Sequence, residues 1–91
     1  MKDVITTEEG KEVHHLVLAE EVSFFNKASV LSALDAIPAN SKVIIDFSKS
    51  KSVAYDVVEL VYDYKTHAKT KKISVETINF IEPENMAVSS H

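Results

Sequence analysis

An alternation of apolar and polar positions runs through residues 4–7 and 11–19, two segments rich in Val, Ile, Thr and Leu. Glu8, Glu9 and Gly10 lie between them, and Gly10 is the only glycine of the chain. A glycine that follows acidic turn-forming residues between two such segments predicts a β-hairpin. Both faces of the second segment carry apolar residues, which favours a strand with a helix over at least one side.

Downstream of the hairpin the apolar spacing becomes nearly helical. Five residues carry this pattern: Ala28, Val30, Leu31, Leu34 and Ile37. Ser23 or Asn26 is expected to cap the start of the helix. Pro38 ends it, because a proline pushes the preceding residue out of the α region. Phe24 and Phe25 lie at the bend into the helix, where aromatic residues are expected in the core more often than at an interface.

The run Lys42–Phe47 is almost continuously apolar, which predicts a central strand buried on both faces. A second helix of about 18 residues follows, and it shows the clearest periodicity of the chain. Its apolar face is formed by Val57, Leu60, Val61, Tyr64 and Ala68. Asp56 and, three positions later, Glu59 resemble a capping box at the positive end of the helix dipole. Basic residues crowd the other end, where cations are favoured: Lys65, His67, Lys69, Lys71 and Lys72.

Residues 73–80 return as a strand, and residues 82–91 are expected to form a loose tail. The order is therefore β-β-α-β-α-β, in which each strand-helix-strand segment calls for a right-handed crossover and parallel pairing. We predict an α/β fold in which a small mixed sheet carries helices packed largely on one face. Residues 1–91 fit a single domain, with a core at about 11–80.

Composition narrows the classes of function. The net charge of −4 argues against a nucleic-acid-binding module, which usually has a basic surface. The chain has no cysteine, so disulfides and thiolate metal sites are excluded. No apolar run reaches the roughly 18–20 residues of a membrane-spanning helix, and the first ten residues lack the apolar centre of a signal peptide. These features predict a soluble, cytoplasmic chain.

Signatures of catalysis are absent from the sequence. It has no Gly-rich phosphate loop, no cysteine nucleophile, no His-Glu-x-x-His motif and no dinucleotide fingerprint. His14 and His15 suggest a metal site, but neighbours on a strand point to opposite faces and cannot chelate one ion together. We expect half-exposed strand histidines instead. The sequence thus predicts no enzyme, no metal and no cofactor.

The loop between the central strand and the second helix is polar. It holds three serines and two lysines: Ser48, Lys49, Ser50, Lys51 and Ser52. A helix N-terminus favours an anion through its free N–H groups and partial positive charge, and the lysines add to that field. Asp56 already places a fixed carboxylate there, which disfavours a diffusible anion. The basic residues of 65–72 are likewise expected to be a solvated helix end rather than a site for anionic lipid or an acidic partner.

Together these segments resemble a STAS domain, the family that joins the anti-anti-sigma factors of bacteria with the cytoplasmic C-terminal domains of SulP-type anion transporters. The resemblance covers about residues 11–80. It rests on the order β-β-α-β-α, on VIIDFS (43–48) as a central strand ending in Asp-x-Ser, and on YDVVELVYDYKTHAKTKKISVETINF (55–80). With VSFFNKASVLSALDAIPANSKVIIDFS (22–48) ahead of them, these segments are most similar to the transporter branch, notably the bicarbonate and sulfate permeases.

In the switchable anti-anti-sigma members, the loop before the second helix reads Asp-Ser-Ser-Gly or similar, and a partner kinase phosphorylates a hydroxyl there. The matching stretch is Ala54-Tyr55-Asp56-Val57, with Asp56 at the phosphoacceptor position and Val57 in place of the glycine. An aspartate carries about one negative charge, against about 1.5–2 for a phosphate, and no phosphatase removes it. The joint therefore resembles a switch whose charge is permanent. Ser48 and the other loop serines are first of all polar loop residues, and their modification stays open.

The resemblance implies a non-catalytic domain that docks under a transporter's membrane domain, pairs with its twin in a homodimer and affects trafficking or transport rate at the inner face of the cell membrane. The expected contact surfaces are the exposed sheet face and edge, the loop 48–56 with Lys49 and Lys51, and the exposed side of the second helix. There Glu59 and Asp63 lie one turn apart and could meet a basic partner, although an ordinary solvated face is the better expectation for either residue alone. The alternative is a free-standing anti-anti-sigma-like protein that binds a kinase or a sigma-regulating partner. A third idea, nucleotide binding at the loop, is disfavoured by the scarcity of glycine.

Overall fold

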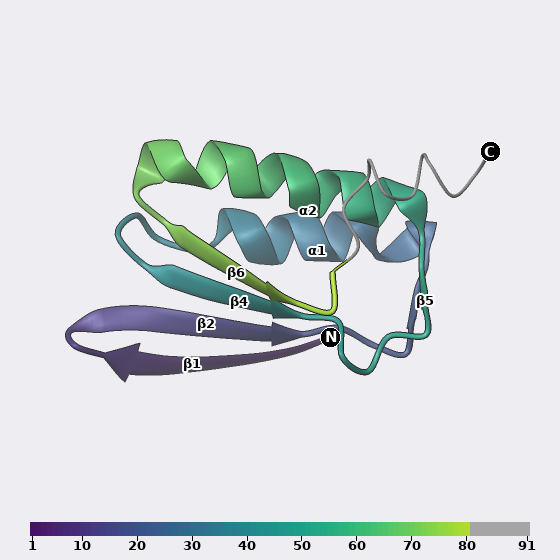
Figure 1. Ribbon diagram of the computed structural model, residues 1–91, viewed down its shortest axis with the longest axis horizontal. Coiled ribbons are helices and arrows are strands. Elements are labelled where there is room, and N and C mark those ends of the chain that lie inside the picture. The colour runs from purple at the N-terminus through teal and green to yellow at the C-terminus, as the bar shows by residue number, and fades with distance from the viewer. Residues whose placement is uncertain (81–91) are drawn as a thin grey trace.

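The protein has two layers, a four-stranded mixed sheet and a pair of α-helices that cover one of its faces (Figure 1). The computed structural model describes residues 1–80, so the predicted tail at 82–91 lies outside the described residues. In the sheet, strands lie in the order β1-β2-β4-β6, and β2, β4 and β6 are parallel. The strands are β1 (Lys2–Glu8), β2 (Lys11–Val17), β4 (Lys42–Asp46) and β6 (Ser74–Ile78). The α/β class, the parallel pairings and the one-sided helices are therefore confirmed.

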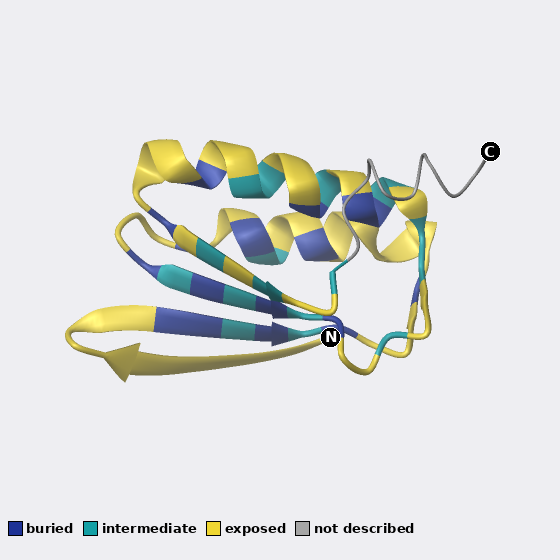
Figure 2. Cartoon of the chain, viewed as in Figure 1, coloured by how far each residue is buried: buried dark blue, intermediate teal, exposed yellow. Residues whose placement is uncertain are grey.

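The predicted hairpin is confirmed and is longer than the sequence pattern indicated. β1 and β2 pair antiparallel from Lys2 opposite Val17 to Glu8 opposite Lys11. Glu9 and Gly10 form the two-residue turn with φ of 53° and 81°. Positive φ at both positions is the geometry of the tight hairpin turn that follows the natural twist of the strands. Every residue of β1 is exposed, so this edge strand adds nothing to the core (Figure 2).

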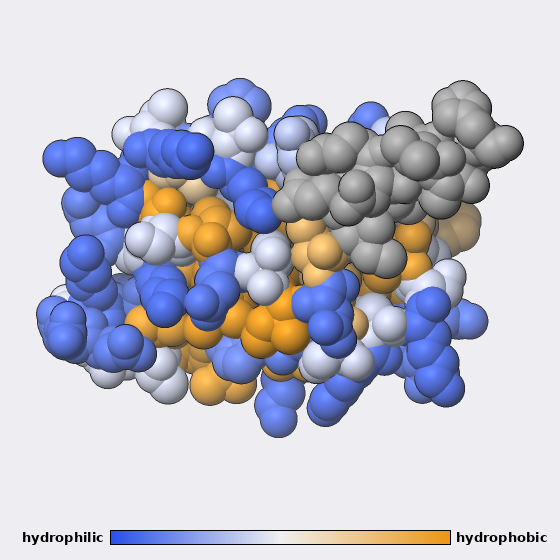
Figure 3. Space-filling view, in the orientation of Figure 1, coloured by the Kyte–Doolittle hydropathy of each residue, from blue (hydrophilic) through white to orange (hydrophobic). Residues whose placement is uncertain are grey.

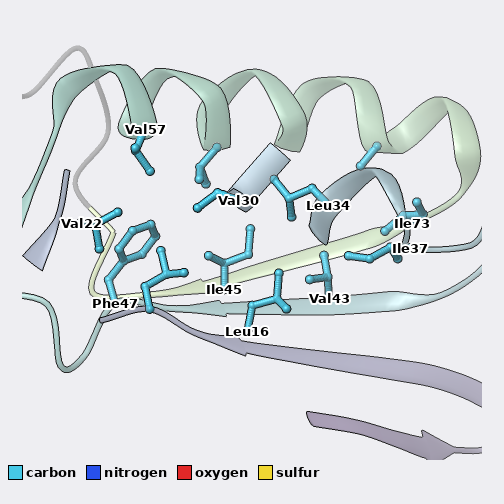
Figure 4. Packing of buried hydrophobic residues seen from close by; sticks show 13 residues of the cluster. Leu16, Val22, Val30, Leu34, Ile37, Val43, Ile45, Phe47, Val57 and Ile73 are labelled. Atoms are coloured by element: carbon cyan, nitrogen blue, oxygen red, sulfur yellow. The ribbon is translucent and has the colours of Figure 1, made fainter. Parts of the chain in front are cut away.

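The core lies between the sheet and the helices (Figure 4). Its largest fully buried side chains come from both layers: Leu16, Leu18, Leu34, Val43, Ile45, Val57 and Val61. β4 is the central strand, but the expectation that it is buried on both faces is wrong. Val43 and Ile45 are buried under the helices, whereas Ile44 is only half-buried on the opposite face. Within residues 1–80 both helices lie on the other side of the sheet, and the strand therefore alternates.

The first helix starts differently from the prediction for its aromatic residues. A single 3-10 turn, η1 (Phe24–Asn26), precedes α1 (Lys27–Asp35). Ser23 caps this turn, since its Oγ accepts from the Phe25 backbone N–H at 3.2 Å and Asn26 Oδ1 accepts from the Ser23 backbone N–H at 2.7 Å. The capped turn leaves Phe24 and Phe25 exposed by 60% and 87%, so their assignment to the core is wrong.

Only part of the predicted apolar face of α1 is buried. Val30 and Leu34 pack into the core, and Ile37 joins them just after the helix. Ala28 and Leu31 are exposed, Leu31 by 44%. The helix thus buries a narrower line than its sequence offers, and the unburied apolar residues lie on the same side as the exposed phenylalanines.

The second helix, α2 (Tyr55–His67), continues as a 3-10 turn, η2 (Ala68–Lys71), which together match the predicted length. Its predicted apolar face is confirmed, with Val57, Val61 and Ala68 buried. Lys72 adopts the left-handed conformation at φ 58° and ends the helical segment. β6 then begins one residue later than predicted and ends at Ile78.

A second, two-stranded sheet was not predicted. β3 (Glu21–Val22) and β5 (Ser52–Val53) pair in parallel. Each is two residues long, which is too short for the apolar periodicity to reveal. The pairing ties the loop after β4 to the segment after β2.

Candidate functional site

The loop between β4 and α2 is held in place by hydrogen bonds to the segment after β2. The Lys51 backbone N–H donates to the Glu20 carbonyl at 2.7 Å, and the Ala54 N–H donates to the Val22 carbonyl at 2.7 Å. The Ser50 hydroxyl donates to the Ala19 carbonyl at 2.6 Å. The serine-rich loop therefore has a defined path, and Ser50 already uses its hydroxyl for structure.

Asp46, at the end of β4, organises the start of this loop. Its Oδ1 accepts from the Ser48 backbone N–H at 2.8 Å, and His15 Nε2 donates to its Oδ2 at 3.3 Å. Hydrogen bonds from the side chain and the backbone of Ser48 lower the pKa of Asp46, and His15 adds to this effect against the opposing effect of burial. Ser48 is exposed, but its first role is to stabilise the Asp46 carboxylate at the strand end.

The predicted capping box at Asp56 and Glu59 is wrong. The N-cap of α2 is Ala54, which has the extended conformation typical of that position (φ −62°, ψ 141°) and makes no side-chain cap hydrogen bond. Its carbonyl accepts the first helical bonds, from the Val57 and Val58 N–H groups at 3.0 and 3.2 Å. Asp56 is a first-turn residue instead, so its contribution is charge near the positive end of the helix and not a cap.

The other residues of the switch-like stretch have structural roles. Val57 is completely buried at the position where the switchable pattern has glycine, so it anchors the first turn of α2 in the core. Ala54 is half-buried and packs against the same core. Tyr55 is exposed by 47%. Of the four residues, only Tyr55 and the half-buried Asp56 face the surface to a degree that a partner can contact.

The acidic residues of α2 lie along one groove. Asp56, Glu59 and Asp63 line one groove between α2 and α1, with a volume of about 350 Å³. From α1 the groove receives Lys27, Leu31 and Asp35. We call this surface the acidic groove. Lys49 and Lys51 belong elsewhere: Lys49 is exposed in the loop, and Lys51 lies beside a different hollow and pairs with Glu20 at 3.4 Å. The sequence-predicted partner surface is thus two separate surfaces.

The open face of the sheet is a third surface. Register places Val4, Val17, Ile44 and Ile78 on the face that α1 and α2 leave free. Val4 and Ile78 are exposed by 41% and 36%, and the other two are half-buried. A separate hollow lies between the edge strand β6 and α2. Figure 3 shows apolar residues across the middle of the molecule on the side that it draws.

The two histidines of β2 have separate hydrogen-bond partners, Glu12 for His14 and Asp46 for His15. His14 and His15 lie on opposite faces of β2, as predicted, but His14 is buried and not half-exposed. It donates to Glu12 Oε1 at 2.9 Å, which satisfies it locally. Over residues 1–80 the structure places no three His, Asp or Glu side chains where they could hold one metal ion.

Sequence reasoning missed two features of the groove region, the exposed Phe24–Phe25 pair and the Tyr64 hydroxyl. Among residues 1–80 the hydroxyl is buried without a hydrogen-bond partner, and both its burial and the charge of Asp35 raise the pKa of Tyr64. The Ser23-x-x-Asn26 pattern is a signal that could have found the first feature, since a capped turn fixes where the intervening side chains point.

Within residues 1–80, no helix combines the length and the apolar character needed to cross a membrane. Comparison with known proteins gives no matching family model, no similar curated protein and no similar solved structure.

Proposed function

We propose that this chain is a non-catalytic docking domain, the STAS domain of a SulP-like anion transporter, which acts through protein contacts in regulation and dimerisation. The observation that carries the proposal is the junction from β4 to α2. There β4 ends at Asp46, which accepts a hydrogen bond from the Ser48 backbone in the loop that follows. Hydrogen bonds to the segment after β2 hold this loop, and Asp56 lies in the first turn of the next helix. The junction joins two of the segments on which the resemblance rests, VIIDFS (43–48) and the segment 55–80.

The junction is built for a fixed shape. The loop has backbone partners in the segment after β2, and the buried Val57 occupies the position where flexibility from a glycine would be needed. A permanent carboxylate at Asp56 replaces a removable phosphate. These features favour a surface that is always ready to dock over one that a kinase turns on and off.

In this proposal the open sheet face is the surface through which two copies of the domain pair. Its apolar residues include Val4, Val17, Ile44 and Ile78, on a face that α1 and α2 leave free. Burying such a face against a second copy would remove apolar surface from water, which is the main driving force of association. The transporter's membrane domain and a regulatory protein are the further partners that the resemblance implies.

The second candidate is a free-standing anti-anti-sigma-like protein locked in one state. The placement of Asp56 in the first turn of α2, at the phosphoacceptor position, favours it. One experiment separates the two functions: an antibody against residues 1–80 is used to blot fractionated source cells. A membrane band much larger than 10.1 kDa supports the transporter domain, whereas a soluble band near that mass removes it and favours the signalling protein.

A further inference from the structure

The exposed phenylalanines and the acidic groove form one continuous surface. Phe24, Phe25 and Leu31 are exposed by 60%, 87% and 44%, and they line a shallow apolar hollow at the start of α1. We call these three residues the phenylalanine patch. Lys27 and Leu31 line both this hollow and the acidic groove, so the two features meet along α1. Contiguous patches of exposed apolar side chains, unlike single exposed residues, mark contact sites when they are large.

The negative charge of the chain is concentrated here. The groove is lined by four carboxylates, Asp35, Asp56, Glu59 and Asp63, and by one lysine, Lys27. With His67 neutral, the lining residues carry a formal charge of −3, against −4 for the whole chain. Among residues 1–80 none of the four carboxylates is in a salt bridge. The charge is therefore uncompensated on the surface, and it would attract a cationic partner.

The shape of the groove suits a helix. It runs between two neighbouring helices, and its residues on α2 extend from Asp56 to His67, roughly 16 Å at the helical rise. Leu31 and Leu60 add apolar side chains to its walls. Tyr64 also lines the groove, and its hydroxyl is buried beneath the surface with no hydrogen-bond partner among residues 1–80.

We propose that the acidic groove and the phenylalanine patch together bind a basic amphipathic helix of a partner protein. Its lysines or arginines face the four carboxylates, and its apolar side chains cover Phe24, Phe25 and Leu31. A negatively charged lipid surface is a poor occupant, because the carboxylates next to the patch would repel it. This inference rests on the proposed docking function and adds the surface and the chemistry of the partner.

The test uses a designed peptide of roughly 14 residues, about four helical turns, with lysines along one stripe and leucines along the next. It is titrated into the full chain, and binding is followed by fluorescence anisotropy and by amide chemical shifts. Two control peptides are used, one with the same residues in an order that breaks the stripes and one with glutamate in place of lysine. The expected result is binding of the lysine peptide alone, with shift changes on η1, α1 and α2, and weakening as salt is raised.

Matched variants locate the contact. Phe25→Ser is expected to weaken binding at least about tenfold, as loss of an aromatic anchor does, and Ile5→Ser on β1 is its apolar control. The double change Glu59→Lys and Asp63→Lys is expected to weaken it roughly tenfold at low salt, with Glu76→Lys on β6 as the charge control. Circular dichroism is recorded for each variant to check that it is folded.

Three results would overturn the inference: equal binding of the lysine peptide and its controls, shift changes confined to the sheet face or the loop, or a second copy of the chain occupying the groove in a dimer that Phe25→Ser dissociates. None of these results would change the blot of the native protein, so the proposed docking function is tested independently of the groove. Conversely, a small soluble native protein would refute the transporter domain and leave the groove's specificity for basic helices intact.

Discussion

The cap of α2 offers a sharp test of how the junction is built. Ala54 occupies the N-cap position with extended backbone angles but has no side-chain oxygen to accept from the Asp56 or Val57 N–H. Serine at an N-cap is worth about 0.5–2 kcal/mol more than alanine. Because Ala54 is half-buried against the core, part of that gain is lost, and we expect Ala54→Ser to raise the free energy of unfolding by about 0.5–1 kcal/mol.

Asp56 behaves differently because it acts only through its charge in the first turn. Asp56→Ala is expected to lower the free energy of unfolding by about 0.3–1 kcal/mol, and salt should shrink that loss. Asp56→Ser is expected to lose about the same amount, since a hydroxyl at this position caps nothing. The salt dependence separates charge from capping.

The assay is thermal and urea unfolding followed by circular dichroism at low and high salt. For a domain of this size about 1 kcal/mol corresponds to roughly 4–8 °C in Tm, so Ala54→Ser should raise Tm by about 2–8 °C. A salt-independent loss of about 2 kcal/mol in Asp56→Ala, with no gain in Ala54→Ser, would refute this account. It would mean that Asp56 is the cap after all.

Three further predictions follow from the described contacts. Asp46→Asn should lower the free energy of unfolding at pH 7 by about 1 kcal/mol, the usual net worth of the hydrogen bonds it weakens. Folding lowers the pKa of Asp46, so the stabilisation that its carboxylate provides is complete above the ordinary value of 3.8 and is lost as the pH falls through the folded-state pKa. The urea midpoints of variant and parent should therefore converge in acid. A gap between the midpoints that stays constant with pH would contradict this. Val57→Gly should lower the free energy of unfolding in urea by about 3 kcal/mol, because a buried side chain is lost and a glycine enters the helix. A loss under about 1 kcal/mol would show that the Val57 side chain is not closely packed. Val4→Lys should weaken the proposed homodimer, measured by analytical ultracentrifugation, at least about tenfold. Ile5→Lys, on the opposite face of the same strand, should leave the dimer affinity unchanged. Equal effects of the two changes would argue against the open sheet face as the interface.

The sequence predicted the elements whose signals are local and repeated. The glycine turn gave the hairpin, and the wide spacing of apolar residues in α2 gave the helix that covers the sheet. Parallel pairing followed from strand-helix-strand order alone. These features depend on neighbours in the chain, so one sequence is enough to find them.

The errors came from choices that depend on three-dimensional context. Leu31 and Val30 both fit a helical face, and only the position of the sheet decides that Val30 is buried and Leu31 exposed. Phe24 and Phe25 carry apolar side chains, but the Ser23-capped turn directs them outward. Asp56 and Glu59 match a capping box, yet the bond from the Ala54 N–H to Val22 fixes the helix start two residues earlier.

The candidate site was predictable in its residues but not in its grouping. Asp56, Glu59 and Asp63 share a face of α2 by helical spacing, and the structure brings them to one groove. Their neighbours Lys27 and Asp35 come from α1, which is distant in the chain, and only tertiary packing puts them there. Lys51 is close to Asp56 in sequence but lies beside a different hollow.

The most direct test of the central claim is alkaline carbonate extraction of source-cell membranes, followed by a blot with an antibody against residues 1–80. Carbonate strips proteins that merely adhere to a membrane and leaves integral proteins in place. If the chain is the docking domain of an anion transporter, the antigen stays in the carbonate-resistant pellet and runs as a chain far larger than 10.1 kDa. Antigen that is fully released would contradict the transporter account.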